Sequence, residues 1–279
     1  MPELTLCGTE RSFAAPRHAP ALLAFMWLLV IAIGPAKAES WHAVYDAYVG
    51  GANALRLSAD VHFDHAGYKV NVQARTLGLI DVFVGSRQST QVNGTWHGML
   101  PQPRQFHADG VWKGDRRITL IDFQDGLPTI RSMIPPELNR EPVPPSARQN
   151  ALDRISPLAY LARRVGQTGN CDGITTTYDG RRLEETKART SGWEELSPGS
   201  LSVFQGRALR CDIELRMTGG FTPDEDRAHA GRIRRAQVWL AAPAPGAPSL
   251  PVLFKLDVGW LGSATVYLSE LRRAAPSAR

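Results

Sequence analysis

The sequence predicts a mainly β protein, built as one large curled antiparallel sheet with one or two short helices. Apolar and polar residues alternate with a period of two through much of the chain after residue 39, the pattern of strands with one buried and one solvated face. Short turn sequences join neighbouring strand candidates, whereas a parallel sheet would require crossover helices. Because a sheet of roughly eight to eleven strands cannot stay flat, we expect it to curl into a half-barrel.

The N-terminal segment 1–38 has the features of a cleaved secretory signal peptide. Arg11 and Arg17 precede an apolar run over 21–33, and the small residues of Ala36-Lys37-Ala38 follow a Gly-Pro break. We therefore expect cleavage after residue 38 and a single β-rich domain over 39–279.

Two alternatives for this segment are less consistent with the sequence. An uncleaved membrane anchor needs about 20 apolar residues, and the run over 21–33 is shorter. A lipoprotein would carry a cysteine directly after the cleavage site, where this chain has Glu39. We therefore predict a periplasmic protein with no stable membrane span.

Composition excludes few other classes. The chain has a formal net charge of +5 and a pI of about 9.3, which outside the cytoplasm suits solubility or weak attraction to anionic lipid headgroups. We predict no nucleic-acid partner and place the arginine pairs 163–164, 181–182 and 234–235 on solvated faces. The Pro-rich stretches 135–145 and 241–251 are short enough to be loops within one domain.

Hairpins account for most of the strand candidates. Alternation over 55–63 resumes at 68–74 after the turn Asp64-His65-Ala66-Gly67, which predicts a β-hairpin. Asp179-Gly180 is a second strong turn sequence. The remaining strand candidates are 117–123, 173–178, 181–187, 209–217, 233–240, 252–258 and 264–268.

One helix is well delimited. Ser156 is a candidate N-cap, Pro157 occupies the first helical position, and Gly166 is a candidate stop. Leu158, Leu161, Ala162 and Val165 form one apolar stripe that requires a sheet to pack against. A second, weaker helical pattern covers 77–84, although it contains a glycine.

This helix is too short to cover the concave face of the sheet. Residues 157–165 span about 14 Å as a helix, whereas ten strands spaced about 4.8 Å apart extend for roughly 48 Å. A loop such as 135–145 or an apolar ligand must fill the remainder. The candidate ligand-lining residues are Phe63, Tyr68, Val70, Val72, Ile213, Leu215, Phe254 and Leu256.

Cys171 and Cys211 are the only cysteines after residue 38. In an oxidising compartment an isolated pair forms a disulfide, and neither residue belongs to a C-x-x-C redox motif. We predict that they are bonded to each other.

No sequence motif specifies catalysis, a metal or a cofactor. The chain lacks G-x-S-x-G, H-E-x-x-H, Walker and G-x-G-x-x-G sequences. His62 and His65 share a hairpin tip but have no further ligands at metal-site spacing. The acidic run 224–226 lacks the spaced ligands of a calcium loop. We therefore predict no catalytic residue, no metal and no cofactor.

Several segments together resemble a known family. They are the sequence from Trp41 to Gly51, the helix 156–161, the turn 178–182 after Cys171, and the strand 208–211. In this order they are similar to domain-of-unknown-function family 3108, a family of exported Gram-negative proteins. The chain departs from the family pattern at one position, because Ser156 stands before the proline where an acidic residue is expected. The resemblance implies a periplasmic location and an outline like the lipoprotein carrier LolA, whose curved antiparallel sheet surrounds helices and an apolar cavity. It implies no catalytic residues.

Three functions remain open. The first is a non-enzymatic periplasmic protein that binds an apolar or amphiphilic molecule, such as a lipid, an acyl chain or a hydrophobic peptide, in envelope maintenance. The second is a structural or adaptor module that binds other envelope proteins through its edge strands. The third is a cell-envelope hydrolase with a triad assembled from scattered residues.

Overall fold

The computed structural model describes residues 40–257 and 262–274, so the predicted signal peptide lies outside the described residues. The described chain forms one thirteen-stranded antiparallel sheet and four short helices. The strands are β1 Ser40–Val49, β2 Ala52–Phe63, β3 Gly67–Thr76, β4 Ser86–His97, β5 Leu100–Trp112, β6 Asp115–Gln124, β7 Leu127–Ile134, β8 Gly173–Tyr178, β9 Leu183–Leu196, β10 Gly206–Gly219, β11 Arg234–Ala241, β12 Leu250–Asp257 and β13 Ser263–Arg273. The helices are α1 Gly78–Val84, α2 Pro145–Arg148, α3 Ser156–Thr168 and α4 Arg227–Ala230.

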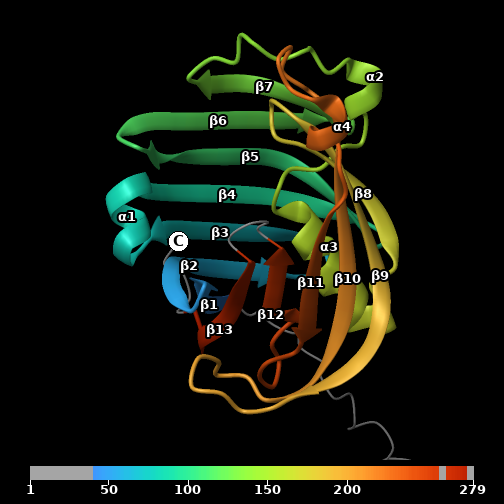
Figure 1. The fold of residues 1–279 in the computed structure, drawn as a ribbon. Helices are drawn as coiled ribbons and strands as arrows, with labels where there is room; N and C mark the ends of the chain where they lie inside the picture. The colour runs from blue at the N-terminus through green and yellow to red at the C-terminus, as the bar shows by residue number, and fades with distance from the viewer. Residues whose placement is uncertain (1–39, 258–261, 275–279) are drawn as a thin grey trace, which may run out of the picture. The chain divides into compact units, whose positions relative to one another are not determined.

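The sheet consists of two meanders joined by the pairing of β1 with β13. Its strand order is β7-β6-β5-β4-β3-β2-β1-β13-β12-β11-β10-β9-β8. The sheet curls so that its two halves face each other, with α3 between them (Figure 1). The predicted fold class, a mainly β chain with a large curled antiparallel sheet and short helices, is confirmed.

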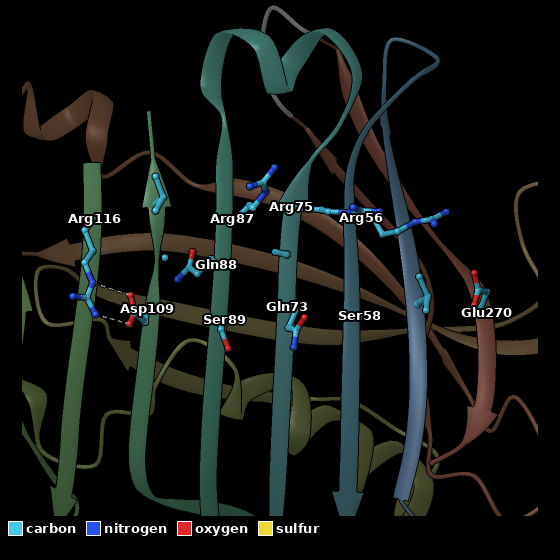
Figure 2. A pocket seen from close by; sticks show the side chains of 14 residues that line it. Arg56, Ser58, Gln73, Arg75, Arg87, Gln88, Ser89, Asp109, Arg116 and Glu270 are labelled. Carbon is cyan, nitrogen blue, oxygen red and sulfur yellow. Dashed lines mark hydrogen bonds and ion pairs between the residues drawn. The ribbon is translucent and has the colours of Figure 1, made fainter. Parts of the chain in front are cut away.

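The β2–β3 hairpin forms at the predicted residues. Val61 pairs with Val70 and Phe63 with Tyr68 in its register. Asp64 stabilises the turn, because its Oδ1 accepts hydrogen bonds from the backbone N–H groups of Ala66 and Gly67, each at 2.7 Å. The opposite face of the hairpin is polar and carries Arg56, Ser58, Gln73 and Arg75 on the outside of the sheet (Figure 2).

The expected number of strands was too low, because the alternation pattern did not indicate β1, β4, β5 and β7. β4 is rich in polar residues, and β5 contains Pro101 and Pro103, which usually argue against a central strand. The register between β4 and β5 shifts next to Pro103, and such a bulge accommodates a proline. Tertiary pairing with both neighbours therefore overrides weak strand propensity here.

The predicted helix forms as α3, but its ends differ from the prediction. Ile155, not Ser156, is the N-cap, and no side chain of that residue caps the helix. Asp153 supplies the cap from upstream, since its Oδ1 accepts hydrogen bonds from the N–H groups of Ile155 at 2.7 Å and Ser156 at 2.9 Å. The helix continues through Gly166 to Gly169, whose φ of 68° ends it in the left-handed region.

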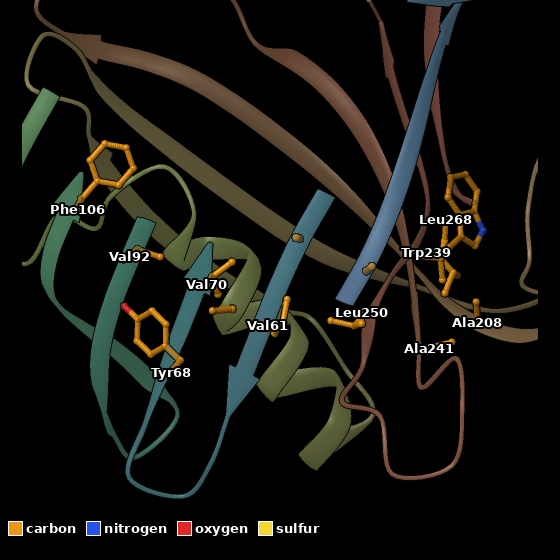
Figure 3. Close-up of a cluster of buried hydrophobic side chains, with 14 of the residues drawn as sticks. Val61, Tyr68, Val70, Val92, Phe106, Ala208, Trp239, Ala241, Leu250 and Leu268 are labelled. Atoms are coloured by element: carbon orange, nitrogen blue, oxygen red, sulfur yellow. The ribbon is translucent and has the colours of Figure 1, made fainter. Parts of the chain in front are cut away.

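The core consists mainly of two hydrophobic clusters. The first contains Tyr68, Val70, Val92 and Phe106 on one half and Trp239 and Leu250 on the other (Figure 3). The second surrounds the disulfide and includes Tyr160, Leu161 and Val165 of α3. Both clusters exist because the even or odd residues of each strand share one face.

The edge strands β7 and β8 are linked by the segment that connects them. Leu152 pairs with β8 in a parallel bridge, donating to Thr176 O at 2.7 Å and accepting from Tyr178 N at 2.8 Å. Asn150 N donates to Gly126 O in the β6–β7 turn at 2.7 Å. This segment therefore covers part of the exposed backbone of β8.

The Pro-rich loop 135–145 also binds the opposite half of the sheet. Glu141 N donates to Phe221 O at 2.9 Å, and Arg181 Nε donates to Glu137 Oε2 at 3.2 Å. The loop thus contacts the connections after β8 and β10. It contributes no residue to the apolar cavity described below.

Candidate functional site

An apolar cavity lies between α3 and the inner face of the sheet. Its volume is about 340 Å³. It is lined by Tyr45, Leu55, Leu57, Ala59, Val61, Phe63, Val70, Val72, Ile155, Leu158, Ala159, Ala162, Leu250, Pro251, Leu253, Phe254 and Val266. These residues come from β1, β2, β3, β12 and β13 and from α3 with the residue before it.

The cavity is suited to an apolar group. None of the lining residues is charged, and the Tyr45 hydroxyl is the only polar side-chain group among them. Burial raises the pKa of Tyr45, so this hydroxyl stays neutral at physiological pH. The volume lies at the lower end of the range of small-molecule sites in proteins, about 300–1,000 Å³.

Strand alternation and small helical residues create the cavity. The inner row of β2, Leu55 to Phe63 at every second position, provides five of the lining side chains. Leu55, Leu57 and Phe63 in this row are only half-buried, because α3 does not cover them. Ala159 and Ala162 face the same space from α3, and their short side chains leave it unfilled.

Half of the predicted lining residues are at the cavity. Phe63, Val70, Val72 and Phe254 line it. Ile213, Leu215 and Leu256 also lie on the inner face, but they pack in the second core cluster around the disulfide. Tyr68 belongs to the first core cluster and is buried.

The sequence pattern contained the signal for some of the missed lining residues. Leu55, Leu57, Ala59 and Val61 alternate in phase with Phe63, so the same reasoning extends to them. Tyr45 pairs with Leu57 across the β1–β2 hairpin, but the alternation pattern did not indicate β1. Val266 reaches the cavity only because β13 pairs with β1.

A buried polar network fixes the N-terminus of α3 above the sheet. The Tyr68 hydroxyl donates to Ser156 Oγ at 2.7 Å, and Ser156 Oγ donates to Asp153 Oδ2. Asp153 and Ser156 are completely buried. Burial raises the pKa of both Asp153 and Tyr68. The network joins β3 to α3 and so holds one wall of the cavity against another.

Aromatic packing supports the same network. The rings of Tyr68 and Trp96 lie 4.8 Å apart between centroids. Gly94 permits this packing, since a Cβ at that position would lie 2.7 Å from the Tyr68 ring. The guanidinium of Arg163 on α3 lies 4.5 Å from the Trp96 ring centroid, a cation–π distance.

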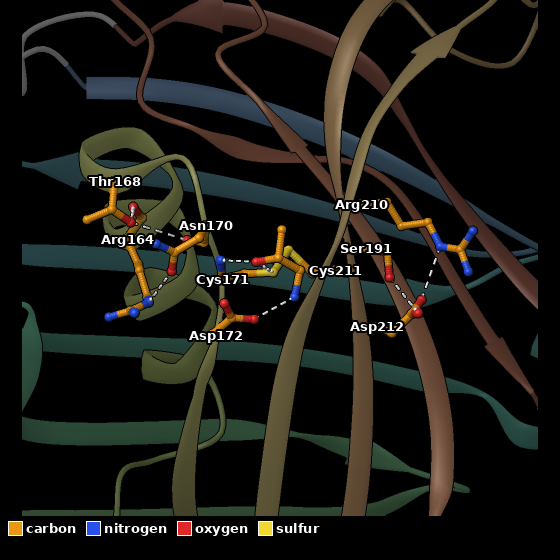
Figure 4. Close-up of a disulfide and its surroundings, with 10 residues drawn as sticks. Arg164, Thr168, Asn170, Cys171, Asp172, Ser191, Arg210, Cys211 and Asp212 are labelled. Atoms are coloured by element: carbon orange, nitrogen blue, oxygen red, sulfur yellow. Dashed lines mark hydrogen bonds and ion pairs between the residues drawn. A yellow bond between two sulfur atoms is a disulfide. The ribbon is translucent and has the colours of Figure 1, made fainter.

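The Cys171–Cys211 disulfide forms as predicted and ties down the other end of α3 (Figure 4). The two Cα atoms are 6.2 Å apart. Cys171 follows the helix closely, and Cys211 lies in β10. Two hydrogen bonds reinforce the link to β9, from Cys171 N to Thr190 Oγ1 at 2.9 Å and from Thr190 N to Asp172 Oδ1 at 2.7 Å.

Other candidate sites have local structural roles. His62 Nδ1 lies 3.1 Å from Ser40 Oγ and its Nε2 3.4 Å from Asp64. In the acidic run 224–226, Asp226 caps α4 by accepting from Ala228 N at 2.9 Å. In residues 40–257 and 262–274, no three His, Cys, Asp or Glu side chains gather as a metal site would require. No helix in the same ranges is long and apolar enough to cross a bilayer.

Comparison with known proteins agrees with the fold. The crystal structure of a β-barrel-like protein of domain of unknown function DUF1849 from Brucella abortus is similar, with a TM-score of 0.53 and 14% sequence identity over 86% of this chain and 99% of that chain. At this identity the likeness concerns the fold alone. A search of curated proteins found no match. The model of a family described as protein of unknown function (DUF3108) matches residues 44–269, and the chain therefore belongs to the DUF3108 family.

Proposed function

We propose that this protein binds an apolar or amphiphilic molecule, such as a lipid or an acyl chain, in the cavity between α3 and the sheet. The observation that supports this most directly is the 340 Å³ space lined by residues without a single charged group. An empty apolar space of this size costs packing energy. A ligand that fills it restores those contacts and removes its own apolar surface from water.

The proposed location is the periplasm. The disulfide is typical of an oxidising compartment, and the N-terminal sequence has the pattern of a secretory signal. An amphiphile carrier in this compartment would serve the maintenance of the envelope, where acyl chains must be shielded from water.

The experiment is a binding titration with an environment-sensitive apolar dye. The folded mature protein is expected to enhance the dye's fluorescence and to release the dye when a fatty acid or phospholipid is added. Native mass spectrometry of protein purified from periplasm would then identify any retained ligand. A folded protein that binds neither dye nor lipid would contradict the proposal.

A pair of variants on one strand tests the position of the site. Val266 lines the cavity, so Val266→Phe should fill part of it and weaken dye binding. Thr265, the preceding residue of β13, faces the other side of the sheet. Thr265→Phe adds the same volume outside the cavity and should leave dye binding unchanged. Equal effects of the two variants would contradict binding at this cavity.

The adaptor function has less support from the fold. Leu152 already pairs with part of the β8 edge, which leaves less backbone for strand addition. For the hydrolase function, the Asp153, Ser156 and Tyr68 cluster offers no reachable nucleophile, since Ser156 is completely buried and its hydroxyl is used to anchor α3.

A further inference from the structure

The short helix α1 carries two neighbouring apolar side chains that are almost free of protein contact. Val82 is 78% exposed and Phe83 is 77% exposed. The helix connects the end of β3 to the start of β4 at one end of the sheet (Figure 1). Scattered single apolar residues are normal on protein surfaces, but two adjacent ones at a projecting corner indicate a contact surface.

Two arginines lie at the base of this helix, one on each flanking strand. Arg75 of β3 and Arg87 of β4 are direct partners in the register of the sheet. Both are exposed on its outer face (Figure 2). Like charges at directly opposed positions destabilise a strand pair. A bound anion would remove this cost.

Carboxylates do not compensate this pair. In the part of the chain that the structure describes, no ion pair or side-chain hydrogen bond joins Arg75 or Arg87 to an acidic residue. Two neighbouring arginines, by contrast, have carboxylate partners, because Arg56 binds Asp46 at 2.8 Å and Arg116 binds Asp109 at 3.0 Å.

The uncompensated positive charge faces an open groove of about 770 Å³ on the outer face of the sheet. Arg75 and Arg87 line it at the end nearest α1, and the hydrogen-bonding side chains of Gln73 and Ser89 line it two residues further along the same strands (Figure 2). Glu270, the acid at the far side of the groove on β13, lies nearer Arg56 than the helix (Figure 2). Asp81 on α1 is also acidic, and its Oδ1 accepts a hydrogen bond from Thr76 Oγ1 at 2.6 Å. Arg75 and Arg87 therefore supply a net positive charge beside Val82 and Phe83.

An aromatic residue lies at the same strand ends, on the opposite face of the sheet from Arg87. Trp112 at the end of β5 pairs with Ser86, the second residue after α1, and is 42% exposed. Tryptophan favours the boundary between headgroups and acyl chains in membranes. The strand ends around α1 thus carry apolar, aromatic and cationic groups, with the aromatic and cationic ones on opposite faces of the sheet.

We propose that α1 and the flanking Arg75 and Arg87 dock the protein on an anionic phospholipid surface. Val82 and Phe83 enter the boundary between headgroups and acyl chains, while the guanidinium groups bind lipid phosphates through charge-assisted hydrogen bonds. Two side chains are too few for a stable protein interface, which buries about 800 Å² on each partner. A weak, reversible membrane contact needs no larger area.

This docking surface is separate from the cavity and does not depend on the proposed ligand binding. The two are nonetheless close in the fold. Leu77 N, just before α1, donates to Ala54 O at 3.0 Å, and the next residue of β2, Leu55, lines the cavity. A protein docked through α1 would hold one end of the cavity near the membrane surface.

Vesicle co-sedimentation of the mature protein tests the proposal. Binding is expected to vesicles that contain phosphatidylglycerol, to be weak on pure phosphatidylcholine, and to decrease as salt is raised. The double variant Arg75→Gln and Arg87→Gln should bind anionic vesicles roughly 25-fold more weakly, at about a fivefold loss per arginine. The double variant Val82→Ser and Phe83→Ser should bind at least tenfold more weakly.

Matched variants on other surfaces control for net charge and hydrophobicity. Arg189→Gln with Arg232→Gln removes two charges from exposed positions elsewhere, and Leu138→Ser removes an apolar side chain that is 83% exposed. These controls should keep wild-type binding. Equal binding to both vesicle types, no vesicle binding, or equal losses in the α1 and control variants would each overturn the proposal. Dye binding in the cavity should be unchanged in the α1 variants, which separates this result from a failure of the proposed function.

Discussion

The Tyr68 hydroxyl lies 2.7 Å from Ser156 Oγ and joins β3 to the first turn of α3 across 88 residues of sequence. The Ser156 hydroxyl in turn donates a hydrogen bond to Asp153, which also accepts hydrogen bonds from the N–H groups of Ile155 and Ser156. A single buried chain of hydrogen bonds therefore determines where α3 begins and where it lies against the sheet. The position of the helix in turn sets the size of the apolar cavity.

Replacing Tyr68 by phenylalanine removes one buried hydrogen bond with almost no change in shape. We expect the free energy of unfolding to fall by about 1 kcal/mol. Ser156→Ala should cost more, roughly 1–3 kcal/mol, because it leaves the buried Asp153 carboxyl with an unsatisfied oxygen. Urea unfolding measures both values, and the double variant should cost less than the sum. Strictly additive losses would mean that the two bonds act independently.

The ion pair between Asp46 and Arg56 predicts a loss of stability in acid. Hydrogen bonds from Arg56 hold the pKa of Asp46 below its ordinary value. Because the folded pKa lies below the unfolded one, the pair contributes fully above about pH 4. Its contribution is lost as the pH falls through the depressed folded pKa.

The variant Asp46→Asn isolates this contribution. It should lower the free energy of unfolding at pH 7 by roughly 1–2 kcal/mol, and the difference from wild type should shrink as the pH falls below 4. Urea unfolding from pH 7 to pH 3 provides the measurement. Asp115→Asn, at an exposed position at the start of β6, serves as a control for the loss of one negative charge. A difference that stays constant with pH would show that the Asp46 charge does not matter.

The disulfide should contribute strongly to stability. It closes a loop with a sequence separation of 40, and the chain-entropy model gives roughly 4 kcal/mol for such a loop as an upper value. The double variant Cys171→Ser and Cys211→Ser should therefore unfold at a clearly lower urea concentration. Thiol titration of the unfolded, unreduced mature protein should find no free thiol. Two reactive thiols would contradict the bond.

The signal-peptide prediction requires cleavage between Ala38 and Glu39. The small residues Ala36 and Ala38 occupy the two positions that the peptidase must accommodate. N-terminal sequencing of protein from the periplasm should begin at Glu39. A mature chain that still contains Trp27 would indicate a membrane anchor instead.

The sequence by itself determined the fold class, the β2–β3 hairpin, the existence of both longer helices and the pairing of Cys171 with Cys211. Each of these features depends either on residues that are close together in the sequence or, for the disulfide, on a pairing for which no alternative partner exists. Alternation places Val70 and Phe63 on one face, and two cysteines allow a single pairing. The resemblance to the family likewise depended on short stretches of sequence, such as Trp41 to Gly51 and the helix 156–161.

Only the tertiary structure decided which residues share the cavity and which share the core. Val266 reaches the cavity because β13 pairs with β1, strands more than 200 residues apart, and no local pattern specifies such a pairing. Ile213 and Leu215 have the same alternation as Val70, yet α3 and the disulfide cover them. The cap of α3 was likewise assigned to Ser156 instead of Asp153, because burial of the Tyr68 hydroxyl next to Ser156 depends on how the helix packs on the sheet. Local sequence sets which face a side chain takes, whereas long-range packing sets what lies opposite that face.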